Sequence, residues 1–277
     1  MPVSRSLSLM DPLIPHEIDR HYTELYDEAV RLDGDAVSRI ELIRTKELIE
    51  RYLPEGPCEI LDVGGGPGVY SAWLGTLGHR PTLVDPVALH VEQAREAGIS
   101  TASLGVAGNL EFEANRFDAV LMLGPLYHLQ DRSDRLDALG EAHRVLKPGG
   151  LIFAAGITRY ASAIDGFDSG FIDHAEFVRI VHKDLETGRH TNSTGDPRFF
   201  TTAYFHRPDE LHDELESSGF TSIEILAVEG MSWAAGDLEE RIADPEKLRA
   251  VLDLLRLLES APSLMGATPH FLGVGRA

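Results

Sequence analysis

The sequence predicts an α/β fold built around a doubly wound, mostly parallel sheet, with helical lid elements beside it. Short apolar segments alternate with helical segments over the first half of the chain, at intervals of about 20–30 residues that are typical of repeated strand–helix units. The predicted strands are apolar almost throughout, as expected for a sheet that helices cover on both faces. The first strand also runs directly into a glycine-rich turn that opens a helix.

Each predicted element follows from a local pattern. Two helices are expected within residues 16–53, because apolar residues recur there at helical spacing, and Leu32-Asp33-Gly34-Asp35 is expected to separate them. Strands and helices then alternate, with Ser133 as the predicted N-cap of a helix and a tight turn at 147–150. The predicted strands are 59–63, 80–85, 99–104, 117–123 and 151–156, and the predicted helices are 69–77, 87–97 and 133–146.

The second half of the chain is less regular. A polar loop is predicted at 188–197, and the remaining pattern indicates helices at 173–185, 208–218 and 248–258 and strands at 221–228 and 270–275. The sheet is therefore interrupted between about residues 157 and 206. A structureless connection longer than roughly 15 residues is uncommon, so this insertion is predicted to be a lid.

Composition excludes several classes of partner. The 277 residues include 25 Lys and Arg against 45 Asp and Glu, which gives a net charge of −20. Such an acidic chain is a poor candidate for binding nucleic acid or an anionic membrane surface. No apolar run reaches the roughly 20 residues that cross a bilayer, and the start of the chain lacks a signal-peptide pattern. The single cysteine, Cys58, excludes an internal disulfide framework and indicates a cytoplasmic location.

The strongest motif is Asp62-x-Gly64-x-Gly66-x-Gly68, at the end of the first predicted strand. Glycines allow the backbone to turn sharply and to approach a ligand closely. The spacing does not fit the G-x-G-x-x-G/A pattern of dinucleotide-binding proteins, which disfavours a nicotinamide-dependent oxidoreductase. An acid at the strand end would repel a phosphate but would suit an ammonium group. S-adenosylmethionine carries an ammonium, a ribose and no phosphate, and Asp85, which ends the second strand, could accept both ribose hydroxyls.

Four segments together resemble the class I S-adenosylmethionine-dependent methyltransferases, and most closely the ubiquinone/menaquinone-methyltransferase-like enzymes that act on small molecules. They are DVGGGPG, LVDP, GVAGNLEFEANRFDAVLML and RVLKPGGLIFAAG, within residues 55–156. Segments 204–220 and 270–275 also resemble the end of that family's domain. The resemblance implies a Rossmann-like sheet of seven strands with the last strand antiparallel. It also implies transfer of a methyl group from S-adenosylmethionine to a small organic acceptor.

The resemblance also assigns a donor site, residue by residue. The methionine end would meet the glycine loop, Asp85 would hold the ribose, and Leu123 and Gly124 would lie near the donor. Many relatives have an Asp after the third strand that binds the adenine, but Gly105-Val106-Ala107 stands here, so the backbone of Ala107 or Asn109 would have to replace it. The implied donor-binding residues are Tyr22, Asp62, Gly64, Gly65, Gly66, Gly68, Asp85, Pro86, Val87, Ala107, Leu123 and Gly124.

Tyr127 and His128, just after the fourth predicted strand, are the candidate catalytic residues. A histidine there could take the acceptor's proton or could orient the strand end, and the second role is preferred because relatives with different acceptors share it. The other histidines lack ligand spacing, so no metal site is predicted. Cationic and aromatic residues of the insertion suggest that it holds a small acceptor bearing a carboxylate, although they could equally solvate a loop. They are Arg159, Arg179 and Arg189 with Phe167, Phe171 and Phe177.

The resemblance further predicts that residues 1–54 form an N-terminal helical lid over a domain that spans 55–277. His21, Tyr22 and Tyr26 would then face the donor, where an aromatic ring can contact the sulfonium, or would simply pack on the sheet. Two other functions stay open at this point. The chain could be a donor-binding regulatory protein without catalysis, or a methyltransferase that acts on a protein.

Overall fold

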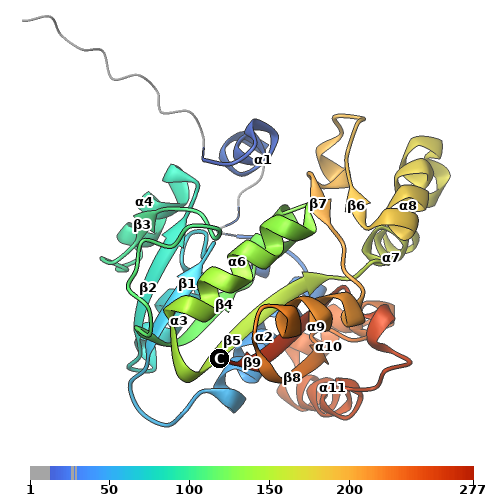
Figure 1. Ribbon diagram of the computed structural model, residues 1–277. Coiled ribbons are helices and arrows are strands. Elements are labelled where there is room, and N and C mark those ends of the chain that lie inside the picture. The colour runs from blue at the N-terminus through green and yellow to red at the C-terminus, as the bar shows by residue number, and fades with distance from the viewer. Residues whose placement is uncertain (1–12, 26–27, 29) are drawn as a thin grey trace, which may run out of the picture.

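A seven-stranded sheet with the order β3-β2-β1-β4-β5-β9-β8 forms the centre of the molecule (Figure 1). The computed structural model describes residues 13–25, 28 and 30–277. The strands are β1 (Glu59–Val63), β2 (Arg80–Asp85), β3 (Ser103–Leu104), β4 (Phe117–Met122), β5 (Leu146–Ile157), β8 (Thr221–Ala227) and β9 (His270–Arg276). Strands β1 to β5 pair in parallel, and β9 lies antiparallel between β5 and β8. The doubly wound sheet with an antiparallel last strand is therefore confirmed.

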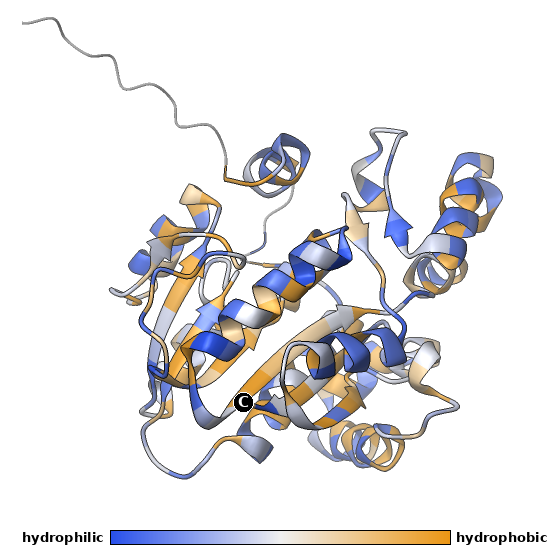
Figure 2. Ribbon diagram, viewed as in Figure 1, coloured by the Kyte–Doolittle hydropathy of each residue, from blue (hydrophilic) through white to orange (hydrophobic). Residues whose placement is uncertain are grey.

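Helices cover both faces of this sheet. One face packs against α2 (Ala36–Tyr52), α3 (Val69–Thr76) and α4 (Ala88–Glu96), and the other against α6 (Arg132–Val145) and α9 (Pro208–Ser217). Figure 2 shows apolar residues concentrated along the strands between these layers. Two further helices, α10 (Leu238–Ala243) and α11 (Pro245–Leu258), pack against α2. Among the described residues, no helix is both long and apolar enough to span a bilayer.

Helix α2 belongs to the core, in contrast to the prediction that all of residues 1–54 form a lid. It begins after Asp35, whose side chain accepts a hydrogen bond from Ser38 N, as an N-cap does. Its residues Ile40, Leu48 and Ile49 are completely buried. The segment before α2 lies over the sheet edge instead. We call residues 13–33 the N-terminal cover; residues 26, 27 and 29 within it are not described.

The N-terminal cover contains α1 (His16–Arg20), a π-helix (His21–Leu25) and a 3₁₀ turn (Arg31–Asp33). Figure 1 shows α1 above the edge of the sheet at which the parallel strands end. Tyr26, which the sequence grouped with His21 and Tyr22, lies outside the described residues.

The insertion at 157–206 is a folded unit with its own small core. It comprises α7 (Ala161–Asp168), α8 (Ala175–Thr187) and a two-stranded sheet of β6 (Arg189–His190) and β7 (Ala203–Tyr204), and it projects beyond the main sheet (Figure 1). The stretch predicted as a polar loop therefore contains a strand. His190 explains the difference, because its ring nitrogens lie 2.8 Å from Asp184 Oδ2 and 2.7 Å from Phe199 O.

Three smaller expectations need correction. The third strand, predicted at 99–104, contains only two residues, because the chain from Ile99 to Ala102 turns against α4. Ser133 is not an N-cap: α6 starts one residue earlier, and Ser133 Oγ bonds to Asp134 instead. The turn predicted at 147–150 lies within the bounds of β5, as an irregularity in its pairing with β4 where Gly149 has a φ of +78°.

Candidate functional site

A cavity of about 400 Å³ opens at the carboxyl ends of β1, β2 and β4, which is where open parallel sheets bind ligands. The N-terminal cover contributes Ile18 and Tyr22 to its lining. All of the predicted donor-binding residues except Gly68 line this cavity, and so do both candidate catalytic residues, Tyr127 and His128. At the predicted adenine edge Ala107 lines the cavity, whereas Asn109 does not.

The loop after β1 requires glycine at defined positions. Gly64 and Gly66 have φ values of +66° and +57°, which side chains disfavour. A Cβ at Gly64 would lie 2.6 Å from Pro125 Cγ, and one at Gly65 would lie 2.7 Å from the carboxylate of Asp62. Gly68 has a different role. A Cβ there would not point into the cavity but would contact Ile99 and Ala94 in the α4 region. Gly68 therefore supports helix packing.

The two strand-end carboxylates are both buried, but they are held differently. Asp62 accepts a hydrogen bond from Ser71 Oγ at 2.7 Å, and burial raises its pKa to about 6. Asp85 Oδ2 accepts from Gly66 N, and its Oδ1 accepts from Val87 N, both at 2.9 Å. Asp85 thus fixes the glycine loop and the start of α4 around one side of the cavity.

His90, on the first turns of α4, is a cavity residue that the sequence analysis missed. Its Nδ1 lies 3.1 Å from Asp85 Oδ1, and only 4% of the residue is exposed. A histidine five residues after a strand-end carboxylate is the signal that could have identified it, since the first turn of the following helix faces back toward that strand end.

His128 joins three segments that are distant in the sequence. Its Nε2 lies 2.7 Å from the hydroxyl of Tyr22 in the N-terminal cover, and its Nδ1 lies 3.3 Å from Thr202 O in the insertion. Burial lowers the pKa of His128 to about 4, so the ring is neutral at physiological pH. A carbonyl only accepts, so Nδ1 carries the proton and Nε2 accepts from Tyr22. Thr202 Oγ1 in turn donates to Glu17 Oε1 at 2.6 Å.

A cluster of charged residues, Glu28, Arg31, Glu41 and His270, also lines the cavity, and sequence reasoning did not find it. Arg31 donates to both oxygens of Glu41, at 2.7 and 2.9 Å, and to Glu28 at 2.8 Å. His270 Nδ1 lies 2.5 Å from Glu229 Oε1. Burial alone would lower the pKa of His270, but the carboxylates of Glu229 and Glu41 outweigh it and raise that pKa to about 9.

These groups are also the residues that could bind a metal. Glu41, Glu229 and His270 present ligand atoms within 4.8 Å of one another. Each carboxylate is already engaged, Glu41 with Arg31, and Glu229 with His270 and Thr268. The proton on His270 Nδ1 would have to leave before a cation could bind there.

The cationic residues of the insertion do not reach the cavity. Arg159 bonds to Glu210, Arg179 pairs with Glu176 on the surface, and Arg189 pairs with Asp131. Phe171 and Phe177 pack inside the insertion, and Phe167 is exposed. In the part of the chain that the structure describes, no residue of 157–206 lines the cavity, so the argument from these side chains for a carboxylate-bearing acceptor loses its basis.

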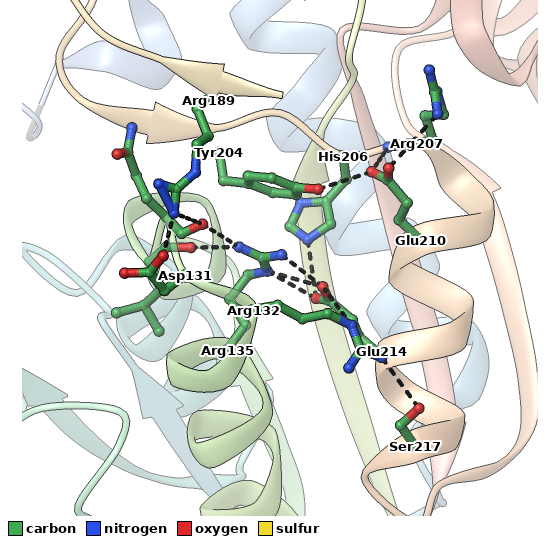
Figure 3. Close-up of polar contacts among 12 residues, drawn as sticks. Asp131, Arg132, Arg135, Arg189, Tyr204, His206, Arg207, Glu210, Glu214 and Ser217 are labelled. Carbon is green, nitrogen blue, oxygen red and sulfur yellow. Dashed lines mark hydrogen bonds and ion pairs between the residues drawn. The ribbon is translucent and has the colours of Figure 1, made fainter. Parts of the chain in front are cut away.

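The insertion is instead tied to the sheet domain by a buried polar network, drawn in Figure 3. Arg135 of α6 donates to Glu214 of α9 at 2.7 Å, and His206 Nε2 lies 3.2 Å from the same carboxylate. The Arg135 guanidinium also stacks on Tyr204, 3.7 Å from the ring centre. The lid histidine His206 therefore has a structural role.

Comparison with known proteins agrees with the fold and the cavity. A family model described as a methyltransferase domain matches residues 61–154. A ubiquinone biosynthesis O-methyltransferase of Methylobacterium nodulans is 32% identical over 187 residues, 64% of this chain and 66% of that protein. An uncharacterised methyltransferase of Mycobacterium tuberculosis is 34% identical over 121 residues, 42% of this chain and 48% of that protein. The matches thus span 48% to 66% of the length of these curated relatives.

Solved structures share the same fold at low sequence identity. An S-adenosylmethionine-dependent methyltransferase from Archaeoglobus fulgidus superposes with a TM-score of 0.55 at 15% identity, over 90% of this chain and 97% of that one. Another, from Methanosarcina mazei, gives 0.55 at 20% identity, over 83% and 96%. The family resemblance inferred from the glycine loop and its neighbouring motifs is confirmed.

Proposed function

We propose that this chain, which belongs to the class I S-adenosylmethionine-dependent methyltransferases, transfers the methyl group of S-adenosylmethionine to a small organic acceptor. One observation carries the proposal: the residues expected to bind the donor follow the ends of four strands or belong to the N-terminal cover, yet all of them except Gly68 line a single cavity. Asp62 would face the donor's ammonium group, and Asp85 would accept hydrogen bonds from its ribose.

The order of the strands suggests how the cavity is divided. The donor-binding residues belong to the ends of β2, β1 and β4, whereas Ala155 of β5 and Leu272 of β9 line the cavity further along the sheet. We assign this second half to the acceptor, so that the transferring methyl group would lie near Leu123 and Gly124. Holding the nucleophile about 3–3.5 Å from the methyl carbon supplies much of the rate enhancement.

The reaction would be an in-line displacement. The lone pair of the acceptor atom forms the bond to the methyl carbon while the carbon–sulfur bond breaks and its electron pair returns to sulfur. The products are the methylated acceptor and S-adenosylhomocysteine, and the acceptor's proton passes to water. Because the sulfonium charge disperses in the transition state, a cavity with apolar walls favours the step.

His128 would position segments in this mechanism rather than accept the proton. Both of its ring nitrogens are engaged, one with the N-terminal cover and one with the insertion. Its low pKa makes it a weak base. We therefore propose that His128 and Tyr22 hold the N-terminal cover over the bound donor, which excludes water.

A small acceptor is supported by two features. Residues of the N-terminal cover line the cavity together with the strand ends, and the relative from Methylobacterium nodulans is named for ubiquinone biosynthesis. The net charge of −20 disfavours nucleic acid. We also propose a cytoplasmic location, since Cys58 is a free thiol. A donor-binding regulatory protein, or an enzyme acting on a protein, is the alternative.

Two measurements test this proposal. Titration calorimetry should detect binding of S-adenosylhomocysteine and no binding of NAD. Methyl-labelled S-adenosylmethionine, incubated with the protein and a cell extract separated into metabolite, RNA and protein fractions, should label the metabolite fraction. Binding without label in any fraction would support the regulatory alternative, and label mainly in protein would support the other one.

A further inference from the structure

Arg31 lines the cavity, and the mechanism described so far gives it no part. Among the described residues, it is the only lysine or arginine in that lining. It belongs to the N-terminal cover, and its side chain is 22% exposed. His270, a second cation of the lining, is already paired with Glu229. Because a buried carboxylate requires a counter-charge, an anionic group of a ligand in this cavity depends on Arg31.

The contacts of Arg31 leave part of its guanidinium available. Nη1 and Nη2 each donate one hydrogen bond to Glu41, at 2.7 and 2.9 Å, and Nε donates to Glu28 at 2.8 Å. A guanidinium has five N–H groups, so two remain, and no hydrogen bond joins these two to another described residue. Since Glu41 belongs to α2, which is part of the core, these contacts fix the orientation of the guanidinium.

Glu28 lies beside the glycine loop. A Cβ placed on Gly66 would lie 3.5 Å from Glu28 Cγ, and both residues line the cavity. Glu28 Oε1 accepts the hydrogen bond from Arg31, whereas no described residue donates to Oε2. Arg31 and Glu28 therefore present a cation and an anion side by side, next to the loop at which the methionine end of the donor is expected.

The glycine loop itself offers few hydrogen-bond donors to a carboxylate. The amides of Gly64, Gly66 and Gly68 all donate to acceptors within the protein. Pro67 has no N–H. A ligand carboxylate beside the loop therefore needs hydrogen bonds from a side chain, and Arg31 has N–H groups left to supply them.

The methionine end of the donor carries the complementary charges, an ammonium group and a carboxylate on one carbon atom. We infer that Arg31 binds this carboxylate and that Glu28 Oε2 accepts a hydrogen bond from the ammonium group. An ammonium has three N–H groups, so Asp62 would contact it from the strand side as well. The N-terminal cover thus recognises the amino-acid end of the donor. The inference rests on the proposed function and assigns two further residues to the donor.

Four ligands test the inference by titration calorimetry with the full-length protein. They are S-adenosylhomocysteine, an analogue that lacks only its carboxylate, an analogue that lacks only its amino group, and methylthioadenosine, which lacks both. We expect S-adenosylhomocysteine to bind about tenfold more tightly than either single-deletion analogue, because each analogue loses a charge-assisted hydrogen bond. Methylthioadenosine should bind most weakly. Equal affinity for S-adenosylhomocysteine and the analogue without the carboxylate would overturn the inference.

Two variants separate the two contacts. Arg31→Gln should bind S-adenosylhomocysteine and the analogue without the carboxylate with similar affinity, while its preference for the amino group remains. Glu28→Gln should show the reverse pattern. Each result is a ratio of affinities within one variant, so a general loss of stability does not produce it. Arg20→Gln and Glu24→Gln, in an exposed ion pair of the same N-terminal cover, are the controls and should keep the wild-type ratios.

The remaining outcomes also decide the matter. If Arg31→Gln does not fold, the double variant with Glu41→Gln, which removes the carboxylate left without its partner, replaces it. Failure of the wild-type protein to bind S-adenosylhomocysteine would remove the proposed function itself. Binding with ratios that are unchanged in the Arg31 and Glu28 variants would remove only the inference. Unchanged ratios together with loss of methyl transfer in Arg31→Gln would show that Arg31 faces the acceptor, which also overturns the inference.

Discussion

Asp85 connects three parts of the donor site through one carboxylate. It accepts from Gly66 N, Val87 N and His90 Nδ1, and one lone pair of Oδ2 remains for a ribose hydroxyl of a donor. We expect Asp85→Ala to weaken S-adenosylhomocysteine binding by roughly 1–3 kcal/mol, because that hydroxyl loses its acceptor. Titration calorimetry measures this, with Asp168→Ala on the exposed insertion as the control. Equal affinity in wild type and Asp85→Ala would remove Asp85 from ribose recognition.

Asp62 should make donor binding depend on pH. Burial raises its pKa to about 6, so the carboxylate is ionised above that pH and becomes protonated as the pH falls through it. An ammonium group on the donor favours the ionised form. Affinity for S-adenosylhomocysteine should therefore decline below about pH 6, by at most about tenfold per pH unit. Calorimetry between pH 5 and 7.5 tests this, and Asp62→Asn should bind more weakly with a flat profile.

His128 should leave a different signature in the kinetics. If it positions the N-terminal cover and the insertion, His128→Ala lowers turnover without removing an acidic limb near pH 6–7 from the pH–rate profile, because its pKa of about 4 lies below that range. Tyr22→Phe removes the same hydrogen bond from the other side and should lower turnover similarly. A limb near pH 6–7 that disappears in His128→Ala would identify His128 as the general base.

At the scale of elements, α2 and the N-terminal cover should respond differently to deletion. Deleting residues 1–33 keeps the Asp35 N-cap and should give a folded protein with weak donor binding. Deleting residues 1–52 removes Ile40, Leu48 and Ile49, which are completely buried. Truncating one such side chain costs about 2–5 kcal/mol, and the whole domain is stable by only about 5–15 kcal/mol. Circular dichroism should show the longer deletion unfolded.

This pair of deletions also separates two descriptions of the N-terminus. If the 34–277 chain binds S-adenosylhomocysteine as tightly as the full chain, then the N-terminal cover does not close over the donor. If the 53–277 chain remains folded, then α2 is not required for folding, which would agree with the prediction that residues 1–54 form a lid.

The sequence predicted those elements whose stability depends on local pattern. Strands β1, β2 and β4 are continuous apolar segments, and the glycine loop turns because of its own residues. The sequence therefore predicted the segments that line the donor side of the cavity. The sequence did not predict the charged residues Arg31, Glu41 and His270 of the cavity. They are far apart in the chain and meet only in the folded structure. The sequence predicts part of the insertion as a loop, because the Asp184–His190 pair that stabilises β6 has no local periodic signature.

At the scale of the whole molecule, two ends of the chain meet at one edge of the sheet. Glu41 from α2 and His270 from the last strand lie within 3.8 Å of each other, and α2 is further bound by Arg44, which donates to Glu259. The N-terminal region and the C-terminal strands therefore stabilise one another through ion pairs beside the cavity. Because the pairs include a histidine, their contribution to global stability depends on pH.

The sign of that dependence follows from the direction of the shift. The pKa of His270 is raised from an ordinary value of 6.5 to about 9 in the folded protein, so between these values the folded state holds a proton that the unfolded state has released. The stabilisation is complete below about pH 6.5 and is lost as the pH rises through 9. The stabilisation is on the order of 3 kcal/mol.

We therefore expect the free energy of unfolding, measured by chemical denaturation, to fall between pH 6.5 and 9. Glu229→Gln removes the carboxylate that raises the pKa of His270, so this variant should be less stable than wild type at pH 6.5 and should show a flatter profile up to pH 9. Glu176→Gln, in the exposed pair with Arg179, should keep the wild-type slope. A wild-type stability that stays constant over this range would mean that His270 is neutral in the folded protein.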